Sequence, residues 1–507
     1  MPSFTSLALA ASAATSVLAA GHASFPIQHR SVAGGNPRNL QKRAAGHDGA
    51  LLANNSYTSY VIDLEIGTPS QLVSVSIDTG SSILWMNADC ANAGNQPYCE
   101  TMAQFNVDKS SSWRDLDQTS TISYGSGNAS LVEGTDVVRI PANVDGTDMT
   151  IPKLQFGVAS ETYIVSAGIL GVCFGEPEGL TTYPNIIDQL SLNNLTNGRV
   201  FSMALGNLTS TDAAGNGVII FGGIDTKKFV GDLVPLPNLP EQKTDPYPMP
   251  RYWVTMESVT INGTDKVVPT NQATLNMTTT NTPITSPKLL ANSSGPVIMD
   301  SGTSFMQLPS EFMKDIATAM GGSLFEGSAV VVDCAWQHSS GYLQFVFGES
   351  SGNHVIIDVP LAAIVLNDDG MCGLGIQPSD GDIMIMGDTL MRQAYYVFDQ
   401  DNKYIYMAPF ADCGSDEETL PQLSEGEFFS YTGACKTSAF AEETASIASA
   451  GAKATATTKG GSTTGATGAA ATGTGGAGGG ANTSAAGRSG TVSAVVLAAG
   501  LVAHLLI

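Results

Sequence analysis

A short motif occurs twice in this chain, and the repeat constrains the fold more than any other feature of the sequence. Residues 75–82 read VSIDTGSS and residues 297–304 read VIMDSGTS. Each copy has an apolar run followed by Asp, a hydroxyl residue, Gly and two more hydroxyl residues. A second pair of similar segments, ILG at 169–171 and IMG at 385–387, follows the two copies at similar distances. Two such coincidences indicate a duplicated lobe.

The motif places an aspartate, Asp78 or Asp300, at the end of an apolar strand and two residues before a glycine. Gly80 and Gly302 allow a tight loop that can approach another backbone closely. If two pseudo-symmetric lobes bring these loops face to face, the two carboxyl groups cannot both ionise, and they share a proton. One carboxylate then activates a water and the protonated partner polarises a carbonyl, so an amide is hydrolysed without metal or covalent intermediate.

The hydroxyl residues of the motif also have a role in this arrangement. Ser81 and Thr303 can donate hydrogen bonds to the outer carboxylate oxygens, while Thr79 and Ser301 can reach across and lock the opposite loop. We therefore predict a catalytic pair, Asp78 and Asp300, and a set of supporting residues. The supporting residues are Thr79, Gly80, Ser81, Ser301, Gly302 and Thr303.

Between its terminal segments the chain is predicted to be an all-β protein with minor helices. Short apolar or alternating runs recur and are broken by Gly, Asn, Asp and Pro. The best helical segment is 310–320, with Ser310 as its cap, one apolar face and Gly321-Gly322 as its stop. The clearest expected strands are 60–66, 72–77, 218–221, 254–261, 342–347 and 395–398.

Taken in order, these motifs resemble the pepsin family of aspartic proteases over about residues 57–412. The resemblance implies a bilobal fold with a cleft between an N-terminal lobe, 44–235, and a C-terminal lobe, 236–413. It also implies peptide or protein substrates, a monomer, and no cofactor or metal. Besides the two catalytic loops it rests on Leu84-Trp85, ISYGSG at 122–127, FGGID at 221–225, IMGD at 385–388 and VFD at 397–399.

The same resemblance identifies 122–127 as a flap hairpin over the substrate. Tyr124 would lie at its tip, Trp85 would support it, and Gly171 and Gly387 would back the catalytic loops. Ordinary β packing is the alternative role for Tyr124 and Trp85. The residues assigned in this way to the flap and to substrate binding are Tyr124, Gly125, Ser126 and Trp85.

Seven cysteines and several Asn-X-Ser/Thr sequons predict passage through the secretory pathway. The order of the cysteines suggests local pairs with Cys173 left over, and we expect Cys173 to be a buried free thiol. No Cys-X-X-Cys occurs, which disfavours zinc. The expected disulfides are Cys90–Cys99 and Cys334–Cys372, where pepsin-like enzymes place one bridge in each lobe, and Cys413–Cys435 beyond the matched region. The expected glycosylation sites are Asn54, Asn128, Asn194, Asn207, Asn262, Asn276 and Asn292.

The N-terminal segment predicts a secreted precursor. Residues 1–20 are interpreted as a signal peptide, with a buried helix as the alternative. Residues 21–43 are interpreted as a propeptide that ends at Lys42-Arg43, which could otherwise be a simple exposed charge pair. Residues 1–43 contain no Asp or Glu, which leaves 18 Lys and Arg against 46 Asp and Glu and a net charge of −28 in the remainder. A basic propeptide docked on an acidic body predicts acid-triggered maturation.

The C-terminal segment predicts attachment to the cell surface. After an extension, 414–443, residues 444–490 are mostly Ala, Gly, Ser and Thr and form a stalk too poor in apolar bulk to pack a core. Residues 491–507 are apolar and read as the tail of a glycosylphosphatidylinositol (GPI) signal, with Asn482 as attachment residue. A transmembrane anchor is the alternative. We expect the protein at the outer plasma membrane or cell wall.

The predicted function is an aspartic endopeptidase that works in an acidic extracellular or cell-surface setting. The terminal segments and the dibasic site resemble the fungal yapsin branch, which prefers Lys or Arg, and the sequence leaves basic and apolar specificities open. The strong negative charge argues against nucleic acid as a partner. A two-carboxylate glycosidase and a catalytically inactive wall or adhesion protein are the alternatives.

Overall fold

The structure is a computed structural model of the chain. Several predicted features lie outside the residues that it describes: the signal peptide, Lys42-Arg43, Ser126, the stalk and the GPI tail with Asn482. The sequons at Asn54, Asn207, Asn276 and Asn292 also lie outside them. The described residues are 21–31, 58–125, 127–140, 148–163, 165, 167–176, 178, 181–206, 217–242, 250–262, 288–290, 293–325, 329–348, 352–368, 371–379, 383–424 and 426–438.

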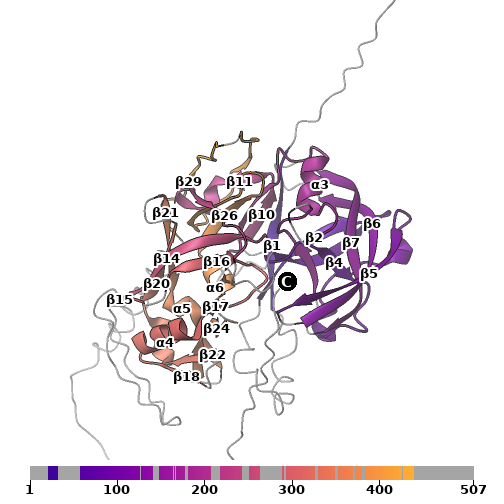
Figure 1. The fold of residues 1–507 in the computed structure, drawn as a ribbon. Helices are drawn as coiled ribbons and strands as arrows, with labels where there is room; N and C mark the ends of the chain where they lie inside the picture. The colour runs from indigo at the N-terminus through magenta and orange to yellow at the C-terminus, as the bar shows by residue number, and fades with distance from the viewer. Residues whose placement is uncertain are drawn as a thin grey trace, which may run out of the picture.

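A long β-sheet joins both halves of the chain. Its third and fourth strands, β26 (Ala394–Asp399) and β9 (Val200–Ala204), pair antiparallel, so strands from the C-terminal and N-terminal halves lie side by side. Figure 1 labels β26 next to β10, the strand that follows β9 in this sheet. Phe201 of β9 and Phe398 of β26 stack with ring centroids 4.8 Å apart. In spatial order the strands are β13 (Val234–Pro237), β27 (Tyr404–Pro409), β26 (Ala394–Asp399), β9 (Val200–Ala204), β10 (Gly217–Phe221), β1 (Ala23–Ser31), β2 (Thr58–Ile66), β3 (Gln71–Asp78), β8 (Gly168–Gly171), β4 (Leu84–Asn87), β7 (Met149–Tyr163), β6 (Gly127–Ile140) and β5 (Arg114–Tyr124).

The C-terminal half has a second large sheet and several small ones. The large one contains β21 (His354–Pro360), β20 (Tyr342–Gly348), β14 (Trp253–Asn262), β16 (Gly295–Met299), β25 (Met384–Met386), β17 (Met306–Leu308) and β24 (Ile376–Pro378), with β15 (Lys288–Leu289) on β14. A smaller sheet contains β18 (Ser323–Phe325), β19 (Ala329–Val332), β23 (Met371–Leu374) and β22 (Val365–Asp368). Two pairs complete the fold: β11 (Gly223–Asp225) with β28 (Glu417–Thr419), and β12 (Val230–Asp232) with β29 (Thr432–Ala434).

The described helices are short, as the sequence predicts for an all-β protein. They are α2 (Gln96–Cys99), α3 (Ile186–Leu192), α4 (Ser310–Ala319), α5 (Leu361–Ile364) and α6 (Asp388–Met391), with 3-10 helices η2 (Val107–Lys109), η3 (Thr226–Lys228) and η4 (Cys334–His338). The helix predicted at 310–320 is confirmed as α4, and Gly321 follows it with φ +66°. Its predicted cap is wrong, because the N-cap residue is Pro309 and no side chain caps the helix.

The duplicated motifs occupy equivalent places in the two halves. β3 runs parallel to β8, which carries the ILG segment, and β16 runs parallel to β25, which carries the IMG segment. Hydrophobic residues of both halves form one continuous core, which includes Phe25 and Ile62 of the N-terminal half and Phe345 and Ile357 of the C-terminal half. The duplication inferred from sequence is therefore a structural one, and the all-β bilobal architecture is confirmed.

Two segments outside the predicted lobes belong to the folded body. Residues 23–31 of the expected propeptide form β1, in the middle of the long sheet. The C-terminal extension supplies β28 and β29, and its Leu420 and Phe429 are buried in a second apolar cluster with Phe229 and Tyr395. In Figure 1, β1 lies beside β10, and β29 lies near β11.

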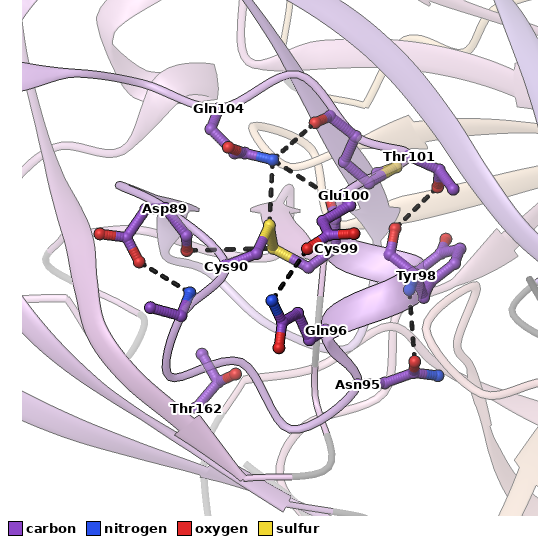
Figure 2. The surroundings of a disulfide bond; sticks show 12 residues. Asp89, Cys90, Asn95, Gln96, Tyr98, Cys99, Glu100, Thr101, Gln104 and Thr162 are labelled. Atoms are coloured by element: carbon purple, nitrogen blue, oxygen red, sulfur yellow. Dashed lines mark hydrogen bonds between the residues drawn. A yellow bond between two sulfur atoms is a disulfide. The ribbon is translucent and has the colours of Figure 1, made fainter.

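The structure forms all three expected disulfides, Cys90–Cys99, Cys334–Cys372 and Cys413–Cys435. Figure 2 shows how the first one is held. The amide nitrogen of Gln104 lies 3.0 Å from Cys90 Sγ and also donates to the backbone oxygens of Cys99 and Met102. Asn95 caps the short helix of this loop by accepting from the Tyr98 N–H. The loop is thus fixed by the bridge and by its own polar contacts.

Cys173 is free and buried, and burial raises the pKa of its thiol to about 12. Because the thiolate is the reactive form, we expect the native protein to react with iodoacetamide about 10³-fold more slowly than an ordinary exposed cysteine. Counting labelled thiols by mass spectrometry tests this, and denaturation should expose one reactive thiol per chain. Rapid labelling of the native protein at Cys173 would contradict it.

In the parts of the chain that the structure describes, no helix is both long enough and apolar enough to cross a membrane.

Candidate active site

The two repeated aspartates lie at equivalent strand ends and approach each other. Asp78 ends β3 and Asp300 follows β16, and both are buried, with 6% relative exposure. A β-carbon added to Gly80 would lie 2.6 Å from Asp300 Oδ1, and one added to Gly302 would be equally close to Asp78. Glycine is therefore required at both positions, because any side chain would collide with the carboxyl group of the opposite lobe.

The two loops are locked to each other through the second residue of each motif. The Thr79 N–H donates to Ser301 Oγ at 3.1 Å, and the Ser301 N–H donates to Thr79 Oγ1 at 2.9 Å. The two hydroxyls donate onward to backbone oxygens, Thr79 to Met299 at 2.9 Å and Ser301 to Ile77 at 3.1 Å. These four buried bonds cross between the lobes, so they fix the relative position of the two aspartates.

Each aspartate accepts the same pair of hydrogen bonds from its own loop, one from a backbone N–H and one from a hydroxyl. Asp78 accepts from Gly80 N at 2.8 Å and Ser81 Oγ at 2.5 Å, and Asp300 accepts from Gly302 N at 2.8 Å and Thr303 Oγ1 at 2.6 Å. The inner oxygens take the backbone donors and the outer oxygens take the hydroxyls. Of the predicted support residues, Gly80, Ser81, Gly302 and Thr303 thus donate to the pair, while Thr79 and Ser301 join the two loops.

The electrostatics of the pair favour one shared proton. Burial raises the pKa of Asp78 well above its usual range, and the nearby carboxylate of Asp300 raises it further. Hydrogen bonds from Ser81 and Gly80 oppose this shift without cancelling it. Since two carboxylates in contact cannot both ionise, the pair carries one proton over a wide range of acidic pH.

The glycines that were expected to back the two loops lie directly behind them. A β-carbon on Gly171 would lie 2.6 Å from the Ser82 carbonyl carbon, and one on Gly387 would lie 2.5 Å from the Phe305 oxygen. The Gly171 N–H also donates to Ile83 O at 3.1 Å. These close approaches let a neighbouring strand support each loop from below.

The flap segment places Tyr124 over the site. Its hydroxyl accepts from Trp85 Nε1 at 2.7 Å, and both rings pack with Ile122 and Leu131 in a small apolar cluster. Burial and the nearby carboxylate of Asp78 raise the pKa of the Tyr124 hydroxyl. Tyr124 ends β5, and β6 begins at Gly127, so the hairpin turn contains Gly125 and Ser126. Ser126 lies outside the residues that the structure describes.

Replacing Tyr124 by Phe should lower kcat/KM for a peptide substrate by about 10-fold. The substitution leaves the buried Trp85 N–H without its acceptor, which costs about 1–3 kcal/mol and loosens the hairpin above the carboxyl pair. Steady-state kinetics with wild type and variant test this. The matched control is Tyr431→Phe in the C-terminal extension, and equal kcat/KM in both variants would refute a role for the Trp85–Tyr124 contact.

The sequence motifs assigned no role to Asp388, a further buried carboxyl group close to the pair. Asp388 is 2% exposed, and burial raises its pKa well above the usual range, while Arg392 opposes the shift. Arg392 Nη1 lies 3.3 Å from the Tyr60 hydroxyl of the other half of the molecule. The IMGD segment contains Asp388, but only the folded structure shows that it is buried and close to Asp78 and Asp300.

This arrangement suits direct water-mediated hydrolysis of an amide. A glycosidase keeps its two carboxyl groups about 5 Å or more apart to accommodate a sugar carbon or a water. Here the two carboxyl groups face each other closely, since a β-carbon added to Gly302 would lie within 3.2 Å of an oxygen of both Asp78 and Asp300. Among the residues that the structure describes, no group of three His, Cys, Asp or Glu side chains is placed to hold a metal ion.

Comparison with known proteins agrees with this geometry. The model of the family described as eukaryotic aspartyl protease matches residues 59–410. The chain therefore belongs to the eukaryotic aspartyl proteases, and its enzyme class is aspartic endopeptidase.

Individual relatives are distant but cover most of the chain. Barrierpepsin of Saccharomyces cerevisiae is 29% identical over 403 residues, which are 73% of this chain and 63% of that protein. Pepsin A of Callithrix jacchus is 28% identical over 386 residues, 72% of this chain and 86% of that protein. The crystal structure of an aspartic proteinase from Irpex lacteus has the same fold, with a TM-score of 0.52 at 20% identity, over 77% of this chain and 98% of that one.

Proposed function

We propose that this protein hydrolyses peptide bonds of proteins or peptides by general acid/base activation of a water between Asp78 and Asp300. The observation that carries this proposal is the pair of locked loops, which hold two buried carboxyl groups close together while each accepts two hydrogen bonds from its own loop. Residue types and geometry match the chemistry that the reaction needs, and no cofactor takes part.

The proposed reaction uses one proton shared by the pair. The ionised carboxyl takes a proton from the bound water, which attacks the scissile carbonyl carbon, while the protonated carboxyl donates to the carbonyl oxygen. The tetrahedral intermediate then collapses as the leaving amine receives a proton, and the pair returns to its starting state. The Thr79–Ser301 lock keeps the carboxyl groups in register throughout, so little reorganisation is needed.

The setting that we propose is the cell surface. The protein would be a monomeric, membrane-anchored ectoenzyme of the yapsin-like branch. This proposal rests on a signal peptide (1–20), a propeptide cut after Arg43, N-glycans, a stalk (444–490) and a GPI tail that leaves Asn482 as the anchor residue. Three disulfides suit an oxidising compartment. A net charge of −28 after Arg43 favours basic peptides and an acidic working pH.

Cleavage of a mixed peptide library by the processed protein at pH 3 to 7, with and without pepstatin, tests this function. Inhibition by pepstatin together with cleavage in acid supports it, and the cut sites decide between Lys/Arg and bulky apolar residues. No cleavage at any pH would overturn the proposal and favour an inactive wall or adhesion protein.

A further inference from the structure

The strand β1 belongs to the segment that we expect to be cut away, yet it lies in the middle of the long sheet. We propose that residues 21–31 stay bound after the chain is cut at Arg43, so that the working enzyme consists of two polypeptides held together without a covalent bond. This inference rests on the proposed processing and deepens it, because it makes the pro-segment a permanent part of the enzyme.

β1 bridges two parts of the sheet that do not pair with each other directly. Its first half pairs antiparallel with β10, from Ala23 opposite Phe221 to Ile27 opposite Gly217. Its second half pairs antiparallel with β2, from Gln28 opposite Val61 to Ser31 opposite Thr58. Loss of β1 would split the sheet and leave the backbone groups of two buried strands without partners, which is strongly unfavourable.

Side chains of β1 also fill the core. Phe25 is 5% exposed and contacts Phe221 edge to face at 6.1 Å, and Ala23 and Ile27 are fully buried. All three belong to the continuous core of the molecule. These contacts are apolar, so protonation of surface carboxylates in acid does not weaken them, unlike an electrostatic attraction between a basic propeptide and an acidic body.

Polar contacts fix both ends of the strand. The Gly21 N–H donates to Leu195 O at 3.0 Å, and His29 Nε2 lies 2.6 Å from Leu205 O. His22 Nδ1 lies 2.8 Å from Thr419 Oγ1, and its Nε2 lies 3.5 Å from Glu417 Oε2. The start of the pro-segment is thereby attached to β28 of the C-terminal extension.

The sequence that follows the cut cannot replace β1 equally well. A replacement strand from 44–57 must place apolar side chains two residues apart, at the positions of Phe25 and Ile27, and still turn into β2 at Thr58. Only Leu51, Leu52 and Tyr57 in this stretch are large and apolar or aromatic, and no two of them are two residues apart. Every register therefore leaves at least one of the two core positions with Gly, Ala, Asn or a polar side chain, so the original strand remains the better occupant.

A cut made in the purified protein tests the inference directly. The full chain is produced with residues 38–43 replaced by the recognition sequence of a site-specific protease, cleaved, and passed over a gel-filtration column without denaturant. We expect one N-terminal peptide per chain to co-elute with the body, as counted by mass spectrometry, and to separate in concentrated guanidinium chloride. Elution of the peptide apart from a folded body in native buffer would overturn the proposal.

Two variants in the same background show what holds the peptide. Phe25→Ala should weaken its retention by about 100-fold or more, because truncation of a buried Phe leaves a cavity. Pro26→Ala is the matched control, since Pro26 is exposed on the same strand, and it should retain the peptide. Equal retention by both variants would refute an apolar anchor at Phe25.

The N-termini of protein made from the unaltered chain test the processing separately. Two termini, near Gly21 and at Ala44, support both proposals. A single terminus near Gly21 shows that no cut occurs at Arg43 and overturns the processing, while the engineered cut still decides whether β1 stays bound.

Discussion

Peptide hydrolysis should fall by about 10⁴-fold when Asp78 is replaced by Asn, with little change in stability. Asn keeps the shape of the side chain, its amide oxygen can still accept from Gly80 N, and the Ser81 hydroxyl can rotate to accept from its amide nitrogen, so the loop remains in place. It can neither share a proton with Asp300 nor act as a base. The variant therefore separates loss of acid/base chemistry from loss of fold, and kcat/KM together with Tm measures both.

The matched control is Asp358→Asn in the C-terminal half. Asp358 is also a partly buried aspartate with a raised pKa, and it accepts a hydrogen bond from Gln344 at 2.9 Å. It lies on β21, which is the edge strand of its sheet and is separated by β20 and β14 from β16, the strand that leads to Asp300. Its replacement should therefore leave kcat/KM unchanged. If Asp78→Asn kept more than about one tenth of the wild-type activity, general acid/base catalysis by this pair would be excluded.

The pH profile of wild type follows from the same pair. Burial and Asp300 raise the pKa of Asp78, so the shared proton persists from acid toward neutral pH. Activity should fall as the pH rises through that pKa, because the proton that polarises the carbonyl is lost. It should fall again in strong acid, when the second carboxyl is protonated and no base remains. Maximal kcat above pH 8 would contradict this assignment.

The site could be predicted from the sequence because its chemistry is local. Each loop carries its own donors, so Gly80 and Ser81 contact Asp78 within three residues of chain. The cross-lobe contact of Thr79 with Ser301 could be anticipated only because the motif is repeated, which implies a pseudo-twofold arrangement. The repeat of the motif therefore predicted a contact between residues far apart in the sequence, which a single motif could not do.

Features that depend on distant packing could not be predicted in this way. The pattern around Lys42-Arg43 indicates a removable segment, and nothing in the local sequence of 23–31 shows that β10 and β2 pair with it. The burial of Asp388 and the Arg392–Tyr60 contact depend on how the two halves meet. The predicted cap at Ser310 failed for a local reason: the preceding Pro309 already sets an extended backbone, with ψ 140°, and takes the cap position.

The raised carboxyl pKa values of this protein should affect its stability as well as its activity. Burial raises the pKa of several aspartates outside the catalytic pair, and in an unfolded chain each would ionise near pH 4. They are Asp188, Asp358, Asp388 and Asp399. Between pH 4 and their folded pKa values, the native state binds more protons than the unfolded state, so the free energy of unfolding decreases as the pH rises.

We expect Tm to be about 5 °C higher at pH 4 than at pH 7, because this proton linkage and the repulsion within a strongly acidic chain act in the same direction. Differential scanning calorimetry of the Asp78→Asn variant measures this without self-digestion during the scan. A Tm that rises from pH 4 to pH 7 would show that depressed carboxyl pKa values dominate instead.

Asp388→Asn identifies the largest single contribution. Asn cannot ionise, so the variant should gain about 3 °C in Tm at pH 7 and change little at pH 4, where Asp388 is only partly ionised in the unfolded state. Asp108→Asn, at an exposed position, should leave the pH dependence as it is. If the two variants show the same pH dependence, burial of Asp388 does not link stability to pH. If only Asp388→Asn flattens it, a carboxyl group buried close to the catalytic pair links the stability of the enzyme to pH.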